Sequence, residues 1–291
     1  MYTKPTIYRA FSIYRLVSGA LAFLFSVVSG IIYGIAGTTG KLFGLSFMEY
    51  LPAELSSFIS GFFWVMSVVL ILTSAISFFF CYMDFSSMFQ FADLIEHEQR
   101  GINAPIRKRS FVLSPKAYKA FGNVVFTIYM ILCFISAVVV IIVNSVAHDI
   151  FIAVPLIPIA IMGLSLFIIY ITYAMRYKAF GDVLEVATEA DQNDPSAQVK
   201  ESLQENKTGI LRGWCTTLFV ICVILTILTI VSCILIACNL PAPISIIAIV
   251  VMIVAWFVSI ITNAVTGCFF DNLATMVERK LIKYNLFKSA F

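Results

Sequence analysis

Long apolar stretches separated by short polar segments dominate the chain. Five of these stretches lack Asp, Glu, Lys and Arg, and they cover residues 16–40, 55–83, 120–148, 150–175 and 213–270. A helix needs about 20 apolar residues to cross the hydrocarbon core of a bilayer. The last stretch is too long for one crossing, and Pro241 and Pro243 divide it. The pattern therefore predicts six transmembrane helices, at about residues 16–38, 58–83, 121–145, 151–175, 214–238 and 244–268.

The crossings are expected to be helical, including the fifth, which is rich in β-branched residues. Backbone polar groups find no water in the hydrocarbon core, so a single segment satisfies them only as a helix. Composition agrees, because 61% of the residues are hydrophobic and 12% are charged. The charged share is about half that of soluble proteins, which excludes a soluble, disordered or disulfide-rich secreted chain. The fold class is therefore an all-α integral membrane protein.

The distribution of basic residues predicts the orientation, because cytoplasmic loops retain Lys and Arg. With the amino terminus inside, the inner segments are residues 1–15, 84–119, 176–212 and 271–291. These segments hold 18 of the 19 basic residues. We therefore expect both termini to be cytoplasmic. The glycosylation sequon at Asn206 then lies inside and should remain unmodified. The sequence does not indicate which membrane holds the protein.

Two inner segments have opposite charge. Residues 100–119 carry six basic and no acidic residues, whereas residues 182–205 carry seven acidic residues and one lysine. Arg107, Lys108 and Arg109 form the centre of the basic segment, and we expect them to lie on anionic lipid headgroups and to fix the topology. The alternative is that the two segments dock on each other or recruit a charged partner.

An internal repeat is the most informative pattern. Three inner helix ends share a Phe-Asp motif, in which an aromatic residue precedes an Asp by two positions: Phe91 and Asp93, Phe180 and Asp182, and Phe269 and Asp271. The aspartates are 89 residues apart in both intervals. The pattern predicts three tandem helical hairpins with cytoplasmic helix extensions, at residues 1–99, 100–190 and 191–291.

A second pattern, the Pro-Tyr motif, precedes two of the hairpins. Residues 5–11 and 115–121 both read Pro-x-x-Tyr-Lys/Arg-Ala-Phe, and the motif is lost near Lys207 to Trp214. Because each hairpin crosses twice, the repeats are expected to be parallel, around an axis along the membrane normal.

Small residues recur at every fourth position of the first predicted crossing. They would lie along one helix face and permit close backbone approach. The residues are Ser18, Ala22, Ser26, Gly30 and Gly34. This face either packs within the bundle or docks a second copy or a membrane partner subunit. A Gly30→Leu substitution should open the contact in both cases, but only docking predicts lost assembly of a folded monomer.

Motifs for chemistry are absent from the sequence. The seven cysteines form no Cys-x-x-Cys pair, and two histidines are too few for a clustered metal site. We therefore expect no cofactor, no metal site and no catalytic residue. The net charge of +3 is too small to indicate nucleic-acid binding.

The predicted function is a non-enzymatic membrane scaffold or accessory subunit that acts through helix packing and the cytoplasmic helix extensions. The predicted crossings contain no charged residue, which disfavours ion-coupled transport. The alternative is a small-solute transporter or channel, with a pathway along the pseudo-threefold axis. Polar residues Asn123, Asn263 and Thr266 would line such a pathway.

Overall fold

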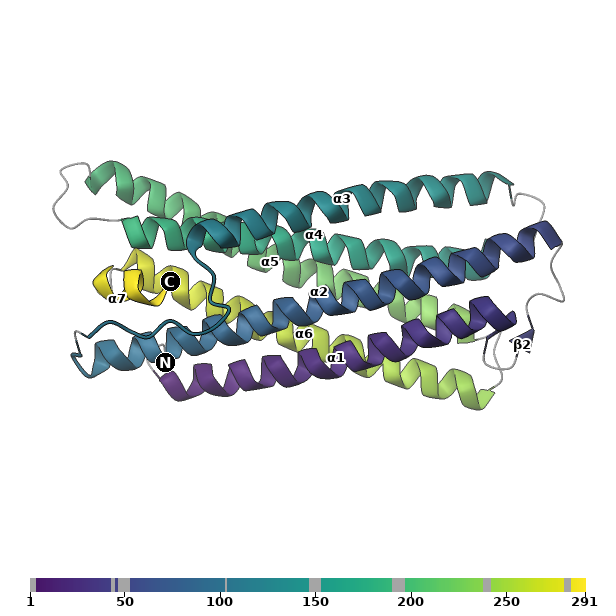
Figure 1. Cartoon of the computed structure of the whole chain (residues 1–291), viewed down its shortest axis with the longest axis horizontal. Helices are drawn as coiled ribbons and strands as arrows, with labels where there is room; N and C mark the ends of the chain where they lie inside the picture. Colours follow the sequence, from purple (N-terminus) through teal and green to yellow (C-terminus); the bar gives the residue numbers. More distant parts are fainter. Residues whose placement is uncertain are drawn as a thin grey trace. The chain divides into compact units, whose positions relative to one another are not determined.

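The computed structural model describes residues 4–42, 45–46, 53–102, 104–146, 153–189, 197–237, 242–279 and 284–291. Within these residues the chain is helical apart from one short strand pair (Figure 1). The helices are α1 (Pro5–Thr39), α2 (Ala53–Gln99), α3 (Pro115–Val146), α4 (Ala153–Glu189), α5 (Ala197–Ala237), α6 (Ala242–Glu278) and α7 (Tyr284–Ala290). Strands β1 (Lys41–Leu42) and β2 (Leu45–Ser46) pair antiparallel, with Lys41 opposite Ser46.

The all-helical prediction is confirmed for the described residues, and five helices are long and apolar enough to cross a membrane. These candidate spans are Pro5–Thr39, Ser60–Gln99, Pro115–Ile135, Glu205–Leu228 and Trp256–Glu278. The remaining predicted crossing, at residues 151–175, falls in α4 and partly outside the described residues. Six crossings therefore stay a prediction.

Three helices continue well beyond their predicted membrane segments. Helix α2 contains 47 residues, which corresponds to about 70 Å at 1.5 Å per residue. A bilayer core is only about 30 Å thick, so much of this helix lies outside it. Helices α4 and α6 likewise extend to Glu189 and Glu278. Each Phe-Asp motif lies on one of these extensions.

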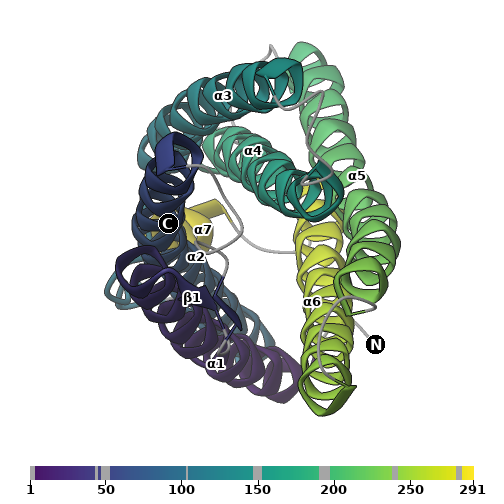
Figure 2. The same cartoon turned by 90° about the vertical axis from the view of Figure 1, so that its right-hand side faces the viewer.

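The chain forms two compact units. One, which we call the α1–α2 unit, is Arg9–Phe89, and the main unit is Met1–Tyr8 with Gln90–Phe291. In the α1–α2 unit the two helices lie side by side (Figure 1). In the main unit α4 contacts α3, α5, α6 and α7, and the end-on view in Figure 2 shows it bordered by the first three. Helix α4 is thus the central element of the main unit.

A serine cap and a proline begin helix α3. Ser114 precedes Pro115, and the main-chain N–H of Ala117 donates to Ser114 Oγ at 3.3 Å. A serine cap satisfies an N–H that has no partner within the helix, and proline fits the first helical position. The sequence has a similar pair of a capping residue and proline before α5, Asp194-Pro195, and this pair lies outside the described residues.

Candidate functional site

An aromatic cluster fills the centre of the main unit where the helix extensions meet. Its rings are buried, and they form a continuous series of ring contacts, most of them edge to face, with centroids 4.7–6.4 Å apart. Such pairs contribute about 0.5–1.5 kcal/mol beyond the area that they bury. The members are Tyr8, Phe91, Tyr118, Tyr177, Phe180, Phe269, Phe270 and Phe291. All three phenylalanines of the Phe-Asp motif belong to this cluster.

The Pro-Tyr motif of α3 and the Phe-Asp motif of α4 are in direct contact. The Tyr118 ring meets Phe180 edge to face, with centroids 4.8 Å apart. Its neighbour Lys119 lies 2.9 Å from Asp182 Oδ1 and donates to Glu185 Oε2 at 2.8 Å. The Pro-Tyr motif therefore supplies the ring that packs on Phe180 and the cation that pairs with Asp182.

The first Phe-Asp motif has a related environment in the main unit. Tyr8 packs on Phe91 edge to face, with centroids 5.2 Å apart and planes at 83°, close to the 82° of Tyr118 on Phe180. Its carboxylate, Asp93, accepts from Arg109 Nε at 2.9 Å. This cation comes from the basic segment.

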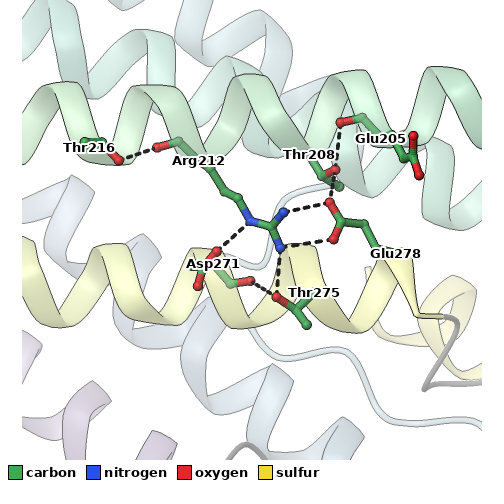
Figure 3. A network of polar contacts seen from close by, with 7 residues as sticks. All are labelled: Glu205, Thr208, Arg212, Thr216, Asp271, Thr275 and Glu278. Carbon is green, nitrogen blue, oxygen red and sulfur yellow. Dashed lines mark hydrogen bonds and ion pairs between the residues drawn. The ribbon is translucent and has the colours of Figure 1, made fainter.

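The third Phe-Asp motif lies in a network around Arg212 (Figure 3). Arg212 Nε donates to Asp271 Oδ1 at 2.6 Å, and Nη1 and Nη2 donate to Glu278 at 2.9 and 3.1 Å. Nη2 also donates to Thr275 Oγ1 at 2.8 Å, and Thr208 contacts the same Glu278 carboxylate. Each Asp of the motif is thus paired with a cation.

Loss of the Arg212 network should weaken the main unit moderately. Because Arg212 is about one-third exposed (36%) and Asp271 about half (52%), water screens the pair, and we expect Arg212→Gln to lower the free energy of unfolding by about 1–2 kcal/mol. The matched control is Arg100→Gln, because Arg100 is 65% exposed in its pair with Glu96 and should cost less than about 0.5 kcal/mol. Thermal unfolding in detergent measures both, and equal losses would contradict a specific role for the network.

The basic segment is fixed to the main unit rather than extended into solvent. Gln90 holds it at two points, since its Oε1 accepts from Arg109 N at 3.0 Å and its Nε2 donates to Arg107 O at 3.5 Å. Lys108 Nζ donates to the main-chain oxygen of Phe291 at 2.6 Å. Partial desolvation of its ammonium group at this contact lowers the pKa of Lys108 from the usual lysine value. Arg107, Lys108 and Arg109 all remain exposed.

The second half of the small-residue face of α1, at Gly30 and Gly34, contacts α2. A Cβ added to Gly30 would lie 2.8 Å from Ile71 Cγ1, and one added to Gly34 would lie 3.2 Å from Ser67 Oγ. Ser18 and Ser26 are half-buried, whereas Ala22 is exposed. The closest approach involves a glycine outside the predicted stripe, Gly19, whose added Cβ would lie 2.5 Å from Cys81 Cβ.

A buried ion pair joins α1 and α2 where their apolar stretches begin and end. Arg15 Nε donates to Asp84 Oδ2 at 2.9 Å, and the two side chains are only 8% and 1% exposed. The sequence marked these residues only as the limits of apolar stretches. The structure shows that they bind each other.

The polar residues of the alternative pathway are not gathered in one place. Asn123 is exposed on α3, whereas Asn263 and Thr266 are buried on α6. Asn263 accepts from the Tyr173 hydroxyl at 2.5 Å and donates to Cys222 Sγ at 3.1 Å. Thr266 donates to a main-chain oxygen one turn earlier at 2.7 Å. The two buried residues therefore have their hydrogen bonds within the protein.

Arg176 is a buried cation that the sequence gave no reason to single out. It directly follows the fourth predicted crossing and is 0% exposed. Its guanidinium lies 4.7 Å from the ring centroid of Tyr173, 5.3 Å from that of Tyr177 and 4.9 Å from that of Phe270. Cation–π contacts of this kind are strongest when desolvated, and they link the aromatic cluster to the Asn263 site.

Several of these contributions could have been found from the sequence. Lys119 and Tyr118 belong to the Pro-Tyr motif, so pairing the two motifs would have predicted their contacts. Near Lys207 to Trp214, where the Pro-Tyr motif is lost, Leu211 is fully buried and is followed by the cation Arg212. Glu278 follows Asp271 by seven residues, as Glu189 follows Asp182, so the predicted repeat could also have pointed to it, whereas Phe270 aligns with Gly181 and gave no such signal.

Comparison with known proteins adds no assignment. Among the described residues, no group of three or more His, Cys, Asp and Glu side chains could hold a metal ion. No protein-family model matches the chain, and neither a curated protein nor a solved structure matches it. The function therefore has to be inferred from the residues of this chain, whose long apolar helices indicate a membrane protein.

Proposed function

We propose that the protein is a non-enzymatic membrane scaffold or accessory subunit with six crossings, three tandem hairpin repeats and both termini in the cytoplasm. It acts through the outward surfaces of its membrane helices and through the cytoplasmic helix extensions around Asp93, Asp182 and Asp271.

The repeat is supported by the matching contacts of the two motifs. Tyr118 on Phe180 and Tyr8 on Phe91 have the same edge-to-face geometry. Lys119 pairs with Asp182 and Arg212 pairs with Asp271, in each case the motif aspartate of the same predicted hairpin. In each of the three hairpins a residue shortly before the first predicted crossing thus contacts the Phe-Asp motif through a ring contact or an ion pair. Duplicated units are expected to share contacts in this way.

The observation that carries the scaffold proposal is the aromatic cluster. A solute pathway needs polar or water-filled space between helices. Here the buried rings form a chain of contacts instead: Phe91 contacts Phe269, Phe269 contacts Phe270, and Phe270 contacts Phe180. Dense packing at this level favours a rigid support over a conduit.

The outward surfaces of the membrane helices support the same function. Helix α1 exposes large apolar side chains along its length, including Val17, Leu21, Leu24, Phe25, Val28, Ile31 and Ile35. A surface of this kind faces lipid tails or another membrane helix. A scaffold would use it to hold a second copy or a partner subunit in the bilayer.

Affinity purification from native membranes tests the proposal. Extraction with a mild detergent, followed by identification of all co-purifying chains and lipids, should recover a second membrane polypeptide or a second copy at constant stoichiometry. A chain that purifies alone, with no partner after cross-linking in the native membrane, would refute the scaffold function.

The second candidate is a small-solute transporter or channel, and the buried polar group at the α4–α6 contact favours it. Arg176, Tyr173 and Asn263 bring a cation, a hydroxyl and an amide together in an apolar setting. Solute flux in liposomes tests this candidate. Flux that Asn263→Leu abolishes, while Asn123→Leu leaves it unchanged, would favour transport through this group.

A further inference from the structure

A strained turn presents an aromatic side chain next to the basic segment. The N–H of Val112 donates to Arg109 O at 3.4 Å, which closes a turn over Ser110 and Phe111. Phe111 has a φ of 65°, the one positive value at a non-glycine residue in the described part of the chain. Glycine or asparagine usually occupies this turn position, so the conformation is strained for phenylalanine. The residue in this strained conformation has an apolar side chain that is 54% exposed.

The surrounding contacts are strong enough to impose this conformation. On one side of the turn, Arg109 is held by Gln90 and Asp93, and on the other side Val112 is buried. Further back, Ile106 is buried and its N–H donates to Ser289 Oγ at 3.3 Å. Strain that persists because neighbouring structure fixes it is typical of functional positions.

The charges beside Phe111 favour an anionic surface. Arg107 and Lys116 are exposed, and their side chains make no hydrogen bond or ion pair with the residues that the structure describes. Residues 100–119 contain no acidic side chain. The patch therefore combines one exposed ring with two exposed cations that no neighbouring acid neutralises.

The position of the turn fits the membrane interface. Phe111 lies four residues before Pro115, where α3 and the candidate membrane span Pro115–Ile135 both begin. The polar layer of a bilayer extends about 5–8 Å beyond each side of the core, so a turn beside the start of this span lies next to that layer. Large apolar and aromatic side chains, Phe included, enter the interface from the protein surface, and basic residues near it are attracted to anionic lipids.

We propose that Phe111, Arg107 and Lys116 form an interfacial anchor that binds anionic phospholipid headgroups, with the Phe111 ring inserted among them. This inference rests on the membrane placement given under the proposed function. The occupant is lipid rather than protein because the patch is a single ring with flanking cations at headgroup depth.

A stability comparison tests the strain directly. Phe111→Gly should raise the unfolding temperature of the full-length protein in neutral detergent by a few degrees, since glycine adopts a positive φ without a Cβ clash. Phe111→Ala keeps the clash and should give no increase. An unfolding temperature that falls in Phe111→Gly would contradict a strained, exposed ring.

Fluorescence quenching in lipid nanodiscs tests the anchor. A Phe111→Trp variant, with Trp64, Trp214 and Trp256 changed to phenylalanine, carries one reporter in the full-length chain. In phosphatidylserine-containing nanodiscs we expect quenching by a lipid with a nitroxide near its headgroup and protection from aqueous iodide. The matched control is Ala104→Trp in the same background, which should show the reverse, because Ala104 is exposed earlier in the same segment.

Removing the cations separates this anchor from simple proximity. Adding Arg107→Gln and Lys116→Gln should abolish the dependence of quenching on phosphatidylserine. Equal access of iodide to tryptophan at positions 111 and 104 would overturn the proposal. It would also be overturned if the tryptophan at position 111 were protected from iodide in native membranes but not in nanodiscs, because a protein would then cover it. Nanodiscs expose both leaflets, so the quenching result does not depend on the orientation of the protein. Glycosylation of Asn206 tests that orientation separately. The result is also independent of whether purification recovers a partner, so the anchor and the scaffold function can fail separately.

Discussion

Replacing Asp84 with leucine should lower the free energy of unfolding by about 3–5 kcal/mol, because the change leaves Arg15 as a buried charge without its carboxylate. The two side chains are 1% and 8% exposed and joined at 2.9 Å, so little water can compensate for the loss. Thermal or denaturant unfolding in detergent measures the effect. It should exceed that of Arg212→Gln, whose partners are far more exposed.

A double variant is the control for the buried pair. Arg15→Met with Asp84→Leu replaces both charges by apolar groups of similar size, and such replacements are often neutral or stabilising. Recovery of most of the lost stability would show that the single variant suffers from an uncompensated charge. A double variant as unstable as the single one would contradict this explanation and indicate a packing role for Asp84.

A methyl group at Gly122 should destabilise the main unit by about 1–3 kcal/mol, because it overfills the contact between α3 and α4. A Cβ at this position would lie 2.7 Å from the main-chain oxygen of Ala174 and 2.9 Å from the N of Lys178. Both are backbone atoms that cannot move without separating the helices. We expect Gly122→Ala to lower the unfolding temperature and to weaken the Tyr118–Phe180 contact nearby.

Gly213→Ala is the matched control for this substitution. Gly213 is exposed on α5, and a Cβ there would meet no atom within 4 Å. Alanine in a helix is favoured over glycine by about 0.5–1 kcal/mol, so this variant should be slightly more stable than the native chain. If Gly122→Ala is also stabilising, the close approach of α3 and α4 is wrong.

The fold class could be predicted from the sequence because the bilayer imposes it. Long uncharged stretches must be helical in lipid, and among the described residues five helices are long and apolar enough to cross a membrane. Helix ends were less predictable. Helix α5 begins at Ala197, 17 residues before the predicted crossing, because polar residues outside the bilayer continue a helix when nothing interrupts it.

The candidate site could be predicted only where a motif repeats. The Phe-Asp motif identified three phenylalanines that share one cluster and three aspartates that each pair with a cation. The partners depend on tertiary contacts that sequence spacing does not contain. Asp93 pairs with Arg109 from a loop, whereas Asp182 and Asp271 pair with residues of a neighbouring helix.

Two features could not have been anticipated from residue types alone. Arg176 resembles any charge at the end of an apolar stretch, yet it is fully buried against three rings. Phe111 resembles an ordinary loop residue, and only its positive φ and exposure distinguish it. In both cases the information lies in backbone geometry and burial, which a single sequence does not encode directly.

The mass of the intact particle, extracted from its native membrane into polymer-bounded discs without detergent, tests the proposed scaffold function most directly. A scaffold predicts a particle that contains this 291-residue chain with a second copy or a partner polypeptide at fixed stoichiometry. A particle that contains one copy of the chain and lipid alone, and that passes a small solute when reconstituted in liposomes, would contradict it.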